Sequence, residues 1–358
     1  MDAIRFEHET DDNFYREVKL RVDDHFRRTG RGRLADRSIL IKAAVFVALI
    51  VGSYALILAH PFPNWTLLPL AFVFGTASLL MAINIGHDAA HRVLFRSAFW
   101  NDVVHGVSFA LLGVSAYLWR MRHIKSHHIF PNVNGCDIDI DENPFLRLSP
   151  NQPWRRHFRF QHLYAPFVYI FVALSTIVWQ DFVYLFKRRL ANMADIRHAP
   201  HQYAIFALCK AFYFGAVLAV PVAVLPLPWW QVLLGYLAMK AVASLVFVFL
   251  LIGTHFSDET DFPSVGADGS VGRTWAQHNL ATACDWAPHS RLAHFFVGGV
   301  NAHASHHLFP GVSHAHYRPI AGIIESTAAE FDVRYNRLSL AGIVRSHFRF
   351  LRRMGMRP

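Results

Sequence analysis

Two pairs of long apolar segments restrict the fold of this chain more than any other feature. Residues 43–59 and 65–85 contain no charged side chain, and a membrane span needs about 20 mostly apolar residues. The link between them, residues 60–64, includes two prolines, which favour a tight turn. The sequence therefore predicts a transmembrane hairpin here. Composition agrees, because only 17% of the residues are charged, against about 25% in soluble domains.

A second transmembrane hairpin is predicted from residues 203–226 and 229–253. Two prolines at its turn end the helices, and the two consecutive tryptophans that follow suit the bilayer interface. Lys210 and Lys240 interrupt this hairpin. We expect each lysine to pack against protein or to extend its ammonium group to the membrane surface.

Two further apolar segments, residues 103–118 and 163–186, are predicted not to span the membrane. Basic residues precede the first hairpin within residues 27–37, and the basic triplet 187–189 follows the second segment. Basic flanks favour the cytosolic side, and a span at 163–186 would place the next basic flank outside. We interpret both segments as membrane-surface or half-buried helices. The predicted fold is an all-α integral membrane protein with four transmembrane helices in two hairpins, membrane-surface helices and a cytosolic helical cap.

The N-terminal segment is predicted to be an amphipathic helix over residues 11–28. Phe14, Val18, Val22 and Phe26 recur every four residues, and the first residues are too polar and acidic for a signal peptide. The net charge is +10, but the basic residues lie beside the spans, so we expect no nucleic-acid partner. The three cysteines form no close pair, which fits a reducing, cytosol-facing setting.

Eight histidines fall into three groups that all follow predicted membrane helices on one side. Residues three and four apart share a helix face, so the members of each group are predicted to point together at one ion: His87 with His91, His123 with His127, and His303 with His306 and His307. Eight imidazoles exceed the four ligands of a tetrahedral zinc site. Two is the smallest number of metal ions that accounts for eight ligands. The full set is His87 and His91 in the first group, His123, His127 and His128 in the second, and His303, His306 and His307 in the third.

The surroundings of these histidines favour a redox-active metal. No glutamate precedes a histidine by three residues, so the pattern of carboxylate-bridged di-iron bundles is absent. The middles of the spans contain no histidine that could hold a haem. A site at the helix ends beside lipid suits a long apolar substrate. Oxidising an unactivated C–H bond favours iron or copper over redox-inert zinc.

At these residues the sequence resembles the membrane-bound fatty acyl desaturases, whose three histidine boxes occur in this order and at about these separations. It is most similar to the front-end desaturases and to bacterial proteins labelled linoleoyl-CoA desaturase. The similarity includes Asn-Gly-Cys-Asp-Ile-Asp-Ile at 134–140, Arg-Phe-Gln-His-Leu-Tyr-Ala-Pro at 159–166 and Gly-Gly-Val-Asn-Ala-His-Ala-Ser-His-His-Leu-Phe-Pro at 298–310. It extends over nearly the whole chain.

The resemblance implies an O2-dependent oxidoreductase that introduces a cis double bond into a long acyl chain and reduces oxygen to water. It implies two iron ions held by the eight grouped histidines and a ninth, for which His255 is our candidate and His278 the rival. Asp137 and Asp139 are expected to orient ligand imidazoles. Asp88 is expected to do the same or to cap a helix, and Asn301 to hold a metal-bound water or to cap a helix. The alternative activity is that of an acetylenase or hydroxylase of the same superfamily.

Two departures from the front-end pattern bear on substrate and partner. His303 stands where front-end desaturases usually carry glutamine, which leaves ligation intact and weakens any inference about double-bond position. The chain contains no His-Pro-Gly-Gly motif, so we expect no fused cytochrome b5 and electrons from a separate ferredoxin or cytochrome b5. We expect one functional unit in three parts: residues 1–38, a cytosolic amphipathic segment; 39–310, the membrane desaturase domain; and 311–358, a cytosolic helical cap.

A group of basic residues is predicted to surround the substrate entrance. Arg155 and Arg156 have two open interpretations: they recognise the phosphate-bearing head group of acyl-CoA, acyl carrier protein or a lipid-linked substrate, or they anchor the protein to anionic lipid. Arg159 lies in the same segment, and Arg120, Arg122 and Lys125 lie near the second histidine group. The active site is expected on the cytosolic face of a bacterial inner membrane.

Overall fold

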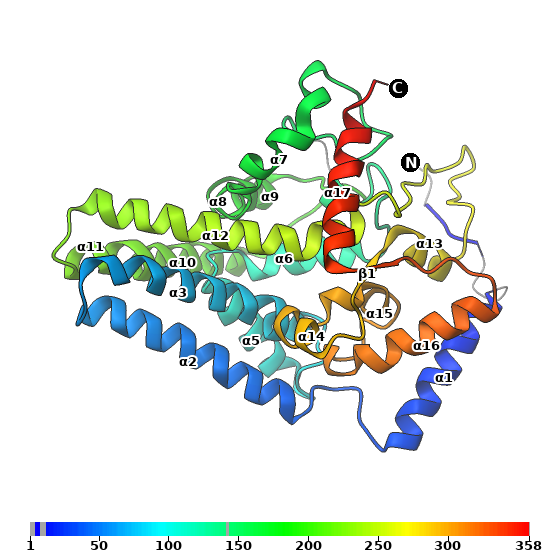
Figure 1. The fold of residues 1–358 in the computed structure, drawn as a ribbon, viewed down its shortest axis with the longest axis horizontal. Helices are drawn as coiled ribbons and strands as arrows, with labels where there is room; N and C mark the ends of the chain where they lie inside the picture. The colour runs from blue at the N-terminus through cyan, green and yellow to red at the C-terminus, as the bar shows by residue number, and fades with distance from the viewer. Residues whose placement is uncertain (1–3, 8–11, 141–142, 358) are drawn as a thin grey trace.

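The computed structural model describes residues 4–7, 12–140 and 143–357. Figure 1 shows a bundle of long helices that leads into a cap of shorter helices. Four helices of the described residues are long and apolar enough to cross a membrane, which confirms the predicted number of spans. They are α2 (Arg37–Ala59), the continuous helix Asn64–Ala90, the continuous helix Pro200–Val224, and α12 (Trp229–His255).

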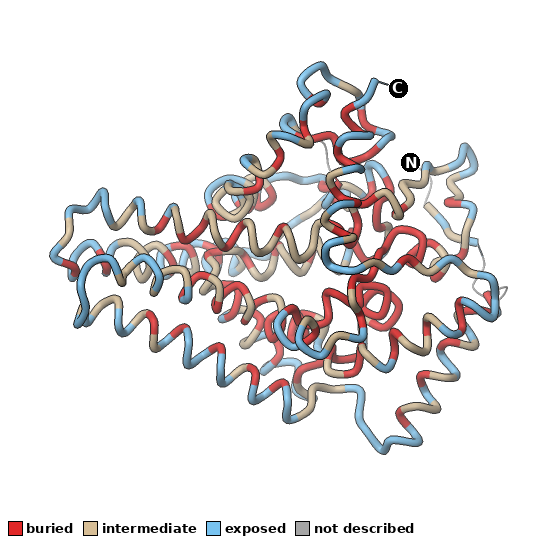
Figure 2. Tube along the Cα trace, in the orientation of Figure 1, coloured by how far each residue is buried: buried red, intermediate tan, exposed pale blue. Residues whose placement is uncertain are grey.

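Two of these spans are composite, because π-helical turns interrupt them. The second span is built from η2 (Asn64–Thr66), α3 (Leu67–Met81), η3 (Ala82–Gly86) and α4 (His87–Ala90). The third is built from α10 (Pro200–Phe214), η8 (Gly215–Ala219) and α11 (Val220–Val224). Figure 2 shows that the bundle carries much exposed and intermediate surface, whereas buried residues gather in the cap. The exposed side chains of the spans are apolar, such as Ile41 and Val51 on α2, as expected of helices that face lipid.

Both lysines of the second hairpin pack against protein. Lys210 Nζ donates to Asp181 Oδ2 at 2.8 Å and to the carbonyl of Gly113 at 2.6 Å, and Lys240 Nζ donates to the carbonyl of Leu112 at 3.1 Å. The turn after α5 is therefore held by two lysines from spans that come much later in the chain. This turn leads into α6, which continues into η4 with the second histidine group. The helices concerned are α5 (Ala98–Ala110), α6 (Ala116–Arg122) and η4 (His123–His127).

The apolar segment predicted at 163–186 forms two helical arms bent by 72° between Arg156–Tyr169 and Val172–Phe186. Near the bend, the backbone N–H of Ala173 donates to Ser244 Oγ on α12 at 2.9 Å. The segment therefore dips beside the bundle, as expected of a half-buried element. It comprises η6 (Arg156–Phe160), α7 (Gln161–Tyr169), α8 (Val172–Ser175), η7 (Thr176–Gln180) and α9 (Asp181–Phe186).

The cap confirms the N-terminal amphipathic helix. α1 (Asn13–Thr29) is capped by Asp12, whose carboxylate accepts the N–H of Tyr15, and it buries the predicted apolar face against α16 (Tyr317–Glu330). The described residues contain one parallel sheet of two strands, and each strand is two residues long. The all-helical prediction does not include this sheet. The remaining elements are η5 (Ile138–Ile140), α13 (Trp275–Thr282), β1 (Asp285–Trp286), α14 (Arg291–Val297), η9 (Val300–Ala302), α15 (His303–Leu308), η10 (His314–His316), β2 (Arg337–Leu338) and α17 (Leu340–Gly355).

Candidate metal centre

All nine histidines predicted as ligands converge where the spans meet the cap. Eight of them form two clusters of four, and within each cluster the potential ligand nitrogens lie within 4.8 Å of one another. His128 lies next to the first cluster, with its Nε2 2.8 Å from His306 Nε2, and its ring stacks on His307 of the second cluster with centroids 4.6 Å apart. The first cluster is His87, His91, His123 and His306, and the second cluster is His127, His255, His303 and His307.

The first histidine group lies on α4, at the end of the second span. The π-helical turn η3 directly precedes it, and such turns are frequent at functional sites. Gly86, the last residue of that turn, allows α5 to approach closely, because a Cβ there would lie 2.8 Å from Ser108 Cβ. His87 and His91 both join the first cluster, as their spacing predicts.

The second histidine group divides between the clusters, contrary to the prediction that His123 and His127 point together. Here the backbone is π-helical, and the N–H of His128 donates to the carbonyl of His123, five residues earlier. The wider turn brings residues five apart onto one side, so His123 and His128 place their Nε2 atoms 3.0 Å apart. His127 faces the second cluster instead.

The third group also divides, because α15 presents two faces. His303 and His307, four residues apart, join the second cluster with Nε2 atoms 3.2 Å apart, whereas His306 joins the first cluster. Gly298 and Gly299 make the turn before this group with φ of 62° and 76°, which glycine adopts without strain.

His255, the candidate ninth ligand, lies in the second cluster at the end of α12. Its Nε2 is 2.6 Å from His303 Nε2 and 3.1 Å from His307 Nε2. The rival, His278, instead places its Nε2 2.9 Å from the carbonyl of Pro131, and it belongs to neither cluster among the described residues.

Two hydrogen bonds fix the tautomers of the second cluster. His255 Nδ1 lies 2.9 Å from the carbonyl of Thr282, and His307 Nδ1 lies 2.9 Å from Asn279 Oδ1. Because both partners only accept, each Nδ1 carries the proton and each Nε2 carries a lone pair. These two bare Nε2 atoms face each other at 3.1 Å. A cation between them turns this repulsion into ligation, so the donor set fits a metal ion.

The protonation states of three other candidate ligands support the same fit, and His127 is the exception. Burial holds the pKa of His128, His303 and His306 well below the ordinary value, and neutral imidazoles are the form that binds metal. Burial also disfavours the charged form of His127, but Asp137 outweighs it and raises the pKa of His127 to about 9.

The expected carboxylates lie in two different settings. Asp137 Oδ2 is 3.1 Å from His127 Nδ1 and Asp139 is 3.7 Å away, the arrangement expected of groups that orient a ligand. Asp88 contacts a different partner: its Oδ1 lies 2.9 Å from His314 Nδ1, and its Oδ2 accepts from Ser313 Oγ at 2.6 Å.

A buried polar chain continues from Asp88 to the first span. His314 Nε2 lies 3.0 Å from Lys42 Nζ on α2, and Lys42 donates to Asn84 Oδ1 at 3.0 Å. Lys42, Asp88 and His314 are 3% exposed or less. Because each buried charge has a partner, the chain ties α2, the first histidine group and the cap together.

Asn301 has one partner and one free buried atom. Its Nδ2 donates to the carbonyl of Ala287 at 3.0 Å, while its Oδ1 is buried without a hydrogen bond in the part of the chain that the structure describes. A free buried acceptor of this kind is compatible with the expected bound water.

The chain is similar in sequence to known proteins over most of its length. A family model described as fatty acid desaturase matches residues 63–339. The chain belongs to the fatty acid desaturase family. It is 27% identical to the sn-1 linoleoyl-lipid 6-desaturase of Synechocystis sp., with 96% of this chain and 95% of that protein covered. It is 28% identical to the protein of the same name from Arthrospira platensis, covering 96% and 93%.

A relative with a different printed name extends the comparison. The chain is 29% identical to the acyl-lipid (8-3)-desaturase of Physcomitrium patens, with 96% of this chain and 72% of that protein covered. The desaturase is therefore a membrane-bound oxidoreductase of fatty acid metabolism, and the predicted family and activity are confirmed.

Several supporting residues of this desaturase were not predicted from the sequence. Asn279 and Thr282 fix ligand tautomers, as described above. Asp285 Oδ1 accepts the N–H of Ala304 at 2.8 Å and so caps the helix of the third histidine group. Trp119 stacks on His123 with centroids 4.4 Å apart. An acidic or amide residue far from a histidine group carries no local signal of such a role.

The basic residues near the second group do not form one free surface. Arg120 pairs with Asp102 at 2.6 Å and Arg122 with Asp139 at 3.0 Å. Arg155 and Arg156 are exposed at the start of η6, in the segment that dips beside the bundle.

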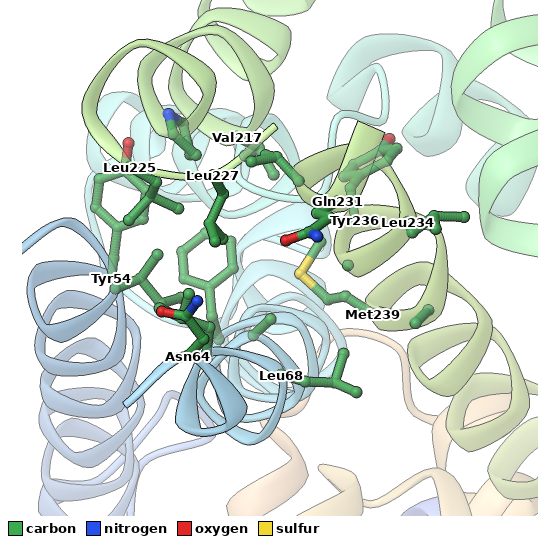
Figure 3. A pocket seen from close by; sticks show the side chains of 18 residues that line it. Tyr54, Asn64, Leu68, Val217, Leu225, Leu227, Gln231, Leu234, Tyr236 and Met239 are labelled. Carbon is green, nitrogen blue, oxygen red and sulfur yellow. The ribbon is translucent and has the colours of Figure 1, made fainter. Parts of the chain in front are cut away.

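An apolar cavity of about 390 Å³ lies at the other end of the spans (Figure 3). Leu68 and Met239 line it, with Tyr54, Val217 and Leu225. Leu68 precedes His87 by 19 residues on the same span, which is about 28 Å of helix. The cavity therefore offers an apolar space near the hairpin turns and is separate from the metal centre.

Proposed function

We propose that the desaturase holds two iron ions in its histidine clusters and introduces a cis double bond into a long acyl chain with O2 as co-substrate. One observation carries this proposal: the bare Nε2 atoms of His255 and His307 face each other at 3.1 Å, inside a set of nine converging histidines. A metal ion ligated by both nitrogens makes this arrangement favourable.

The two clusters divide the ligands. The first ion would be held by His87, His91, His123, His128 and His306, and the second by His127, His255, His303 and His307. When bound, the iron pair supplies the oxidising power that an unactivated C–H bond requires. Asn301 Oδ1 is proposed to hold a metal-bound water.

The protein's own contribution is position and the exclusion of water. Asp137 and Asp139 hold the ring of His127, and the carbonyl of Thr282 holds that of His255. His303, His306 and His307 are at most 4% exposed, so bulk water is kept from the α15 side of the centre, whereas His91 and His123 of the first cluster are half-buried. A methylene pair held beside the clusters reacts in a fixed geometry.

Substrate and partners follow from the relatives and the charge pattern. We propose a front-end double bond in a lipid-linked acyl chain, because relatives named as linoleoyl-lipid and acyl-lipid desaturases match nearly the whole chain. Electrons come from a separate ferredoxin or cytochrome b5. Asn192, just after the basic residues 187–189, donates to the carbonyl of Lys125 in the second histidine group at 2.8 Å, which supports a cytosolic active site in the bacterial inner membrane.

The test is expression in a host whose lipid profile is known, with its reductant supplied. Fatty-acid mass spectrometry should show a product that has lost two hydrogens, and His306→Ala should abolish it. A product with one added oxygen would indicate a hydroxylase, and a triple bond an acetylenase. An unchanged lipid profile from folded protein that contains two iron ions would refute desaturation.

A further inference from the structure

The segment of residues 156–186, which we call the re-entrant segment, enters and leaves the bundle on the same side. At its start, Gln161 Nε2 donates to the carbonyl of Leu351 on α17 at 2.9 Å, and α17 packs on Gly253 near the histidine end of α12. Its other end leads to α10, whose first residue lies at that same end of the second hairpin. The two arms, bent by 72° against each other, therefore form an open V.

The bend of the V lies well below the histidine level. Ala173, just after the bend, is bonded to Ser244, which precedes His255 by 11 residues on α12. At 1.5 Å per residue this is a depth of about 16 Å, roughly half of a 30 Å hydrocarbon core. The segment thus extends into one leaflet only.

The V has a protein face and an outer face. Ala165, Tyr169 and Ile177 are buried against the bundle and α17. The outer face carries large apolar side chains that are mostly exposed: Leu163 at 69%, Phe167 at 65%, Trp179 at 69% and Phe186 at 72%. An exposed apolar surface of this kind, continuous with lipid-facing spans, is stable only in hydrocarbon.

Both ends of the V are basic and unneutralised. Six cations flank it and all are exposed. Unlike Arg120 and Arg122, none of them forms an ion pair with an acidic side chain among residues 4–7, 12–140 and 143–357. They are Arg155, Arg156 and Arg159 at the first end and Lys187, Arg188 and Arg189 at the second.

We propose that the re-entrant segment is a wedge in the cytosolic leaflet whose two basic ends bind the phosphates of anionic lipid head groups. An apolar face between two cationic ends matches a leaflet, which offers hydrocarbon below and phosphate above. Guanidinium groups bind phosphate in a bidentate manner. Arg155 and Arg156 had two open interpretations. The proposal selects anchoring to anionic lipid over recognition of the substrate head group.

Thermal unfolding of the full-length protein in detergent tests the proposal. Dioleoylphosphatidylglycerol should raise the melting temperature clearly more than dioleoylphosphatidylcholine does. A triple variant, Arg155→Gln with Arg156→Gln and Arg159→Gln, should lose at least about half of that difference. The same should hold for glutamine at 187–189. The matched control is Arg16→Gln with Arg27→Gln and Arg28→Gln on α1, which removes equal charge from the cap and should keep the full difference.

Coenzyme A distinguishes the source of the phosphate. If coenzyme A raises the melting temperature of the wild type but not of the Arg155 triple variant, while phosphatidylglycerol acts equally on both, the arginines recognise a soluble head group and the proposal is wrong. Equal phosphatidylglycerol responses in the wild type, both triple variants and the control would also overturn it. The readout needs no catalysis, so it is independent of the proposed iron chemistry.

Discussion

The two histidine clusters contain the same kind of ligand but differ in how the rings are held. In the second cluster, His127, His255 and His307 each have an Nδ1 partner. In the first cluster, His306 has only a long contact of 3.3 Å to the hydroxyl of Tyr317, and His87 Nδ1 is buried without a hydrogen bond among the described residues. The second cluster is therefore oriented before metal binds, whereas the first leaves its rings freer to adjust.

Loss of a ligand in either cluster should have the largest effect. His307→Ala and His87→Ala should each reduce activity to background, because the proposed chemistry needs both ions. Metal analysis of the purified variants should show about one iron per chain in place of two. A variant that keeps a tenth of wild-type activity would show that its cluster is not required for the reaction. That cluster would then be a structural site, and the other cluster the catalytic one.

The second largest effect should come from removing the carboxylate of Asp137, which contacts His127. Asp137→Asn keeps the shape but removes the negative charge, and losses of such partners lower metal affinity about 10–100-fold. Iron titration monitored by absorbance should show one weakened site and one unchanged site. Asn279→Ala, which removes a neutral partner from the same cluster, is the control and should weaken that site less. If both sites lost the same affinity, Asp137 would not act on the second cluster alone, and the prediction would be wrong.

Breaking the buried polar chain through Asp88 should lower the metal affinity of the first cluster alone, and by less than the change at Asp137. Asp88→Asn or His314→Gln breaks the link between the first histidine group, the cap and Lys42, and we expect a loss of about tenfold in affinity, the lower end of such effects. The same titration measures it. His347→Leu is a matched control, because this buried histidine also makes two hydrogen bonds, to Tyr169 and Phe256, outside both clusters.

The last prediction concerns that control histidine, which should affect the stability of the protein and not its metal affinity. Burial lowers the pKa of His347 from 6.5 to about 4. Because the unfolded chain protonates first, His347 contributes stability above pH 6.5, and this is lost as the pH falls towards 4, by about 3 kcal/mol at most. The difference in melting temperature between wild type and His347→Leu should shrink over that range, with activity unchanged at neutral pH. A constant difference would contradict the pKa.

The sequence predicts those parts of the molecule that depend on local pattern. Long, mostly apolar runs predict the four spans, and the repeat of Phe14, Val18, Val22 and Phe26 predicts α1. Histidine spacing predicts that the ligands meet. It does not predict how the second group divides, because the pattern assumes 3.6 residues per turn and the backbone at 123–127 is π-helical. The choice between α and π hydrogen bonding depends on tertiary packing.

The supporting residues depend on contacts between distant segments, which sequence spacing does not record. Asp88 illustrates this, since its position inside the first histidine group suggests a ligand-orienting role. Its partners are Ser313 and His314, more than two hundred residues later. Asp285 and Asn279 lie in no motif and gain their roles only when the cap folds over the clusters.

The lysines of the second hairpin set an order of assembly during synthesis. Lys210 reaches back 97 residues to Gly113, and Lys240 reaches back 128 residues to Leu112. The ribosome therefore releases the helix of the second histidine group long before its anchors exist. That helix gains these two anchors only after the second hairpin has been synthesised, so the histidine clusters are complete only late in the maturation of the protein.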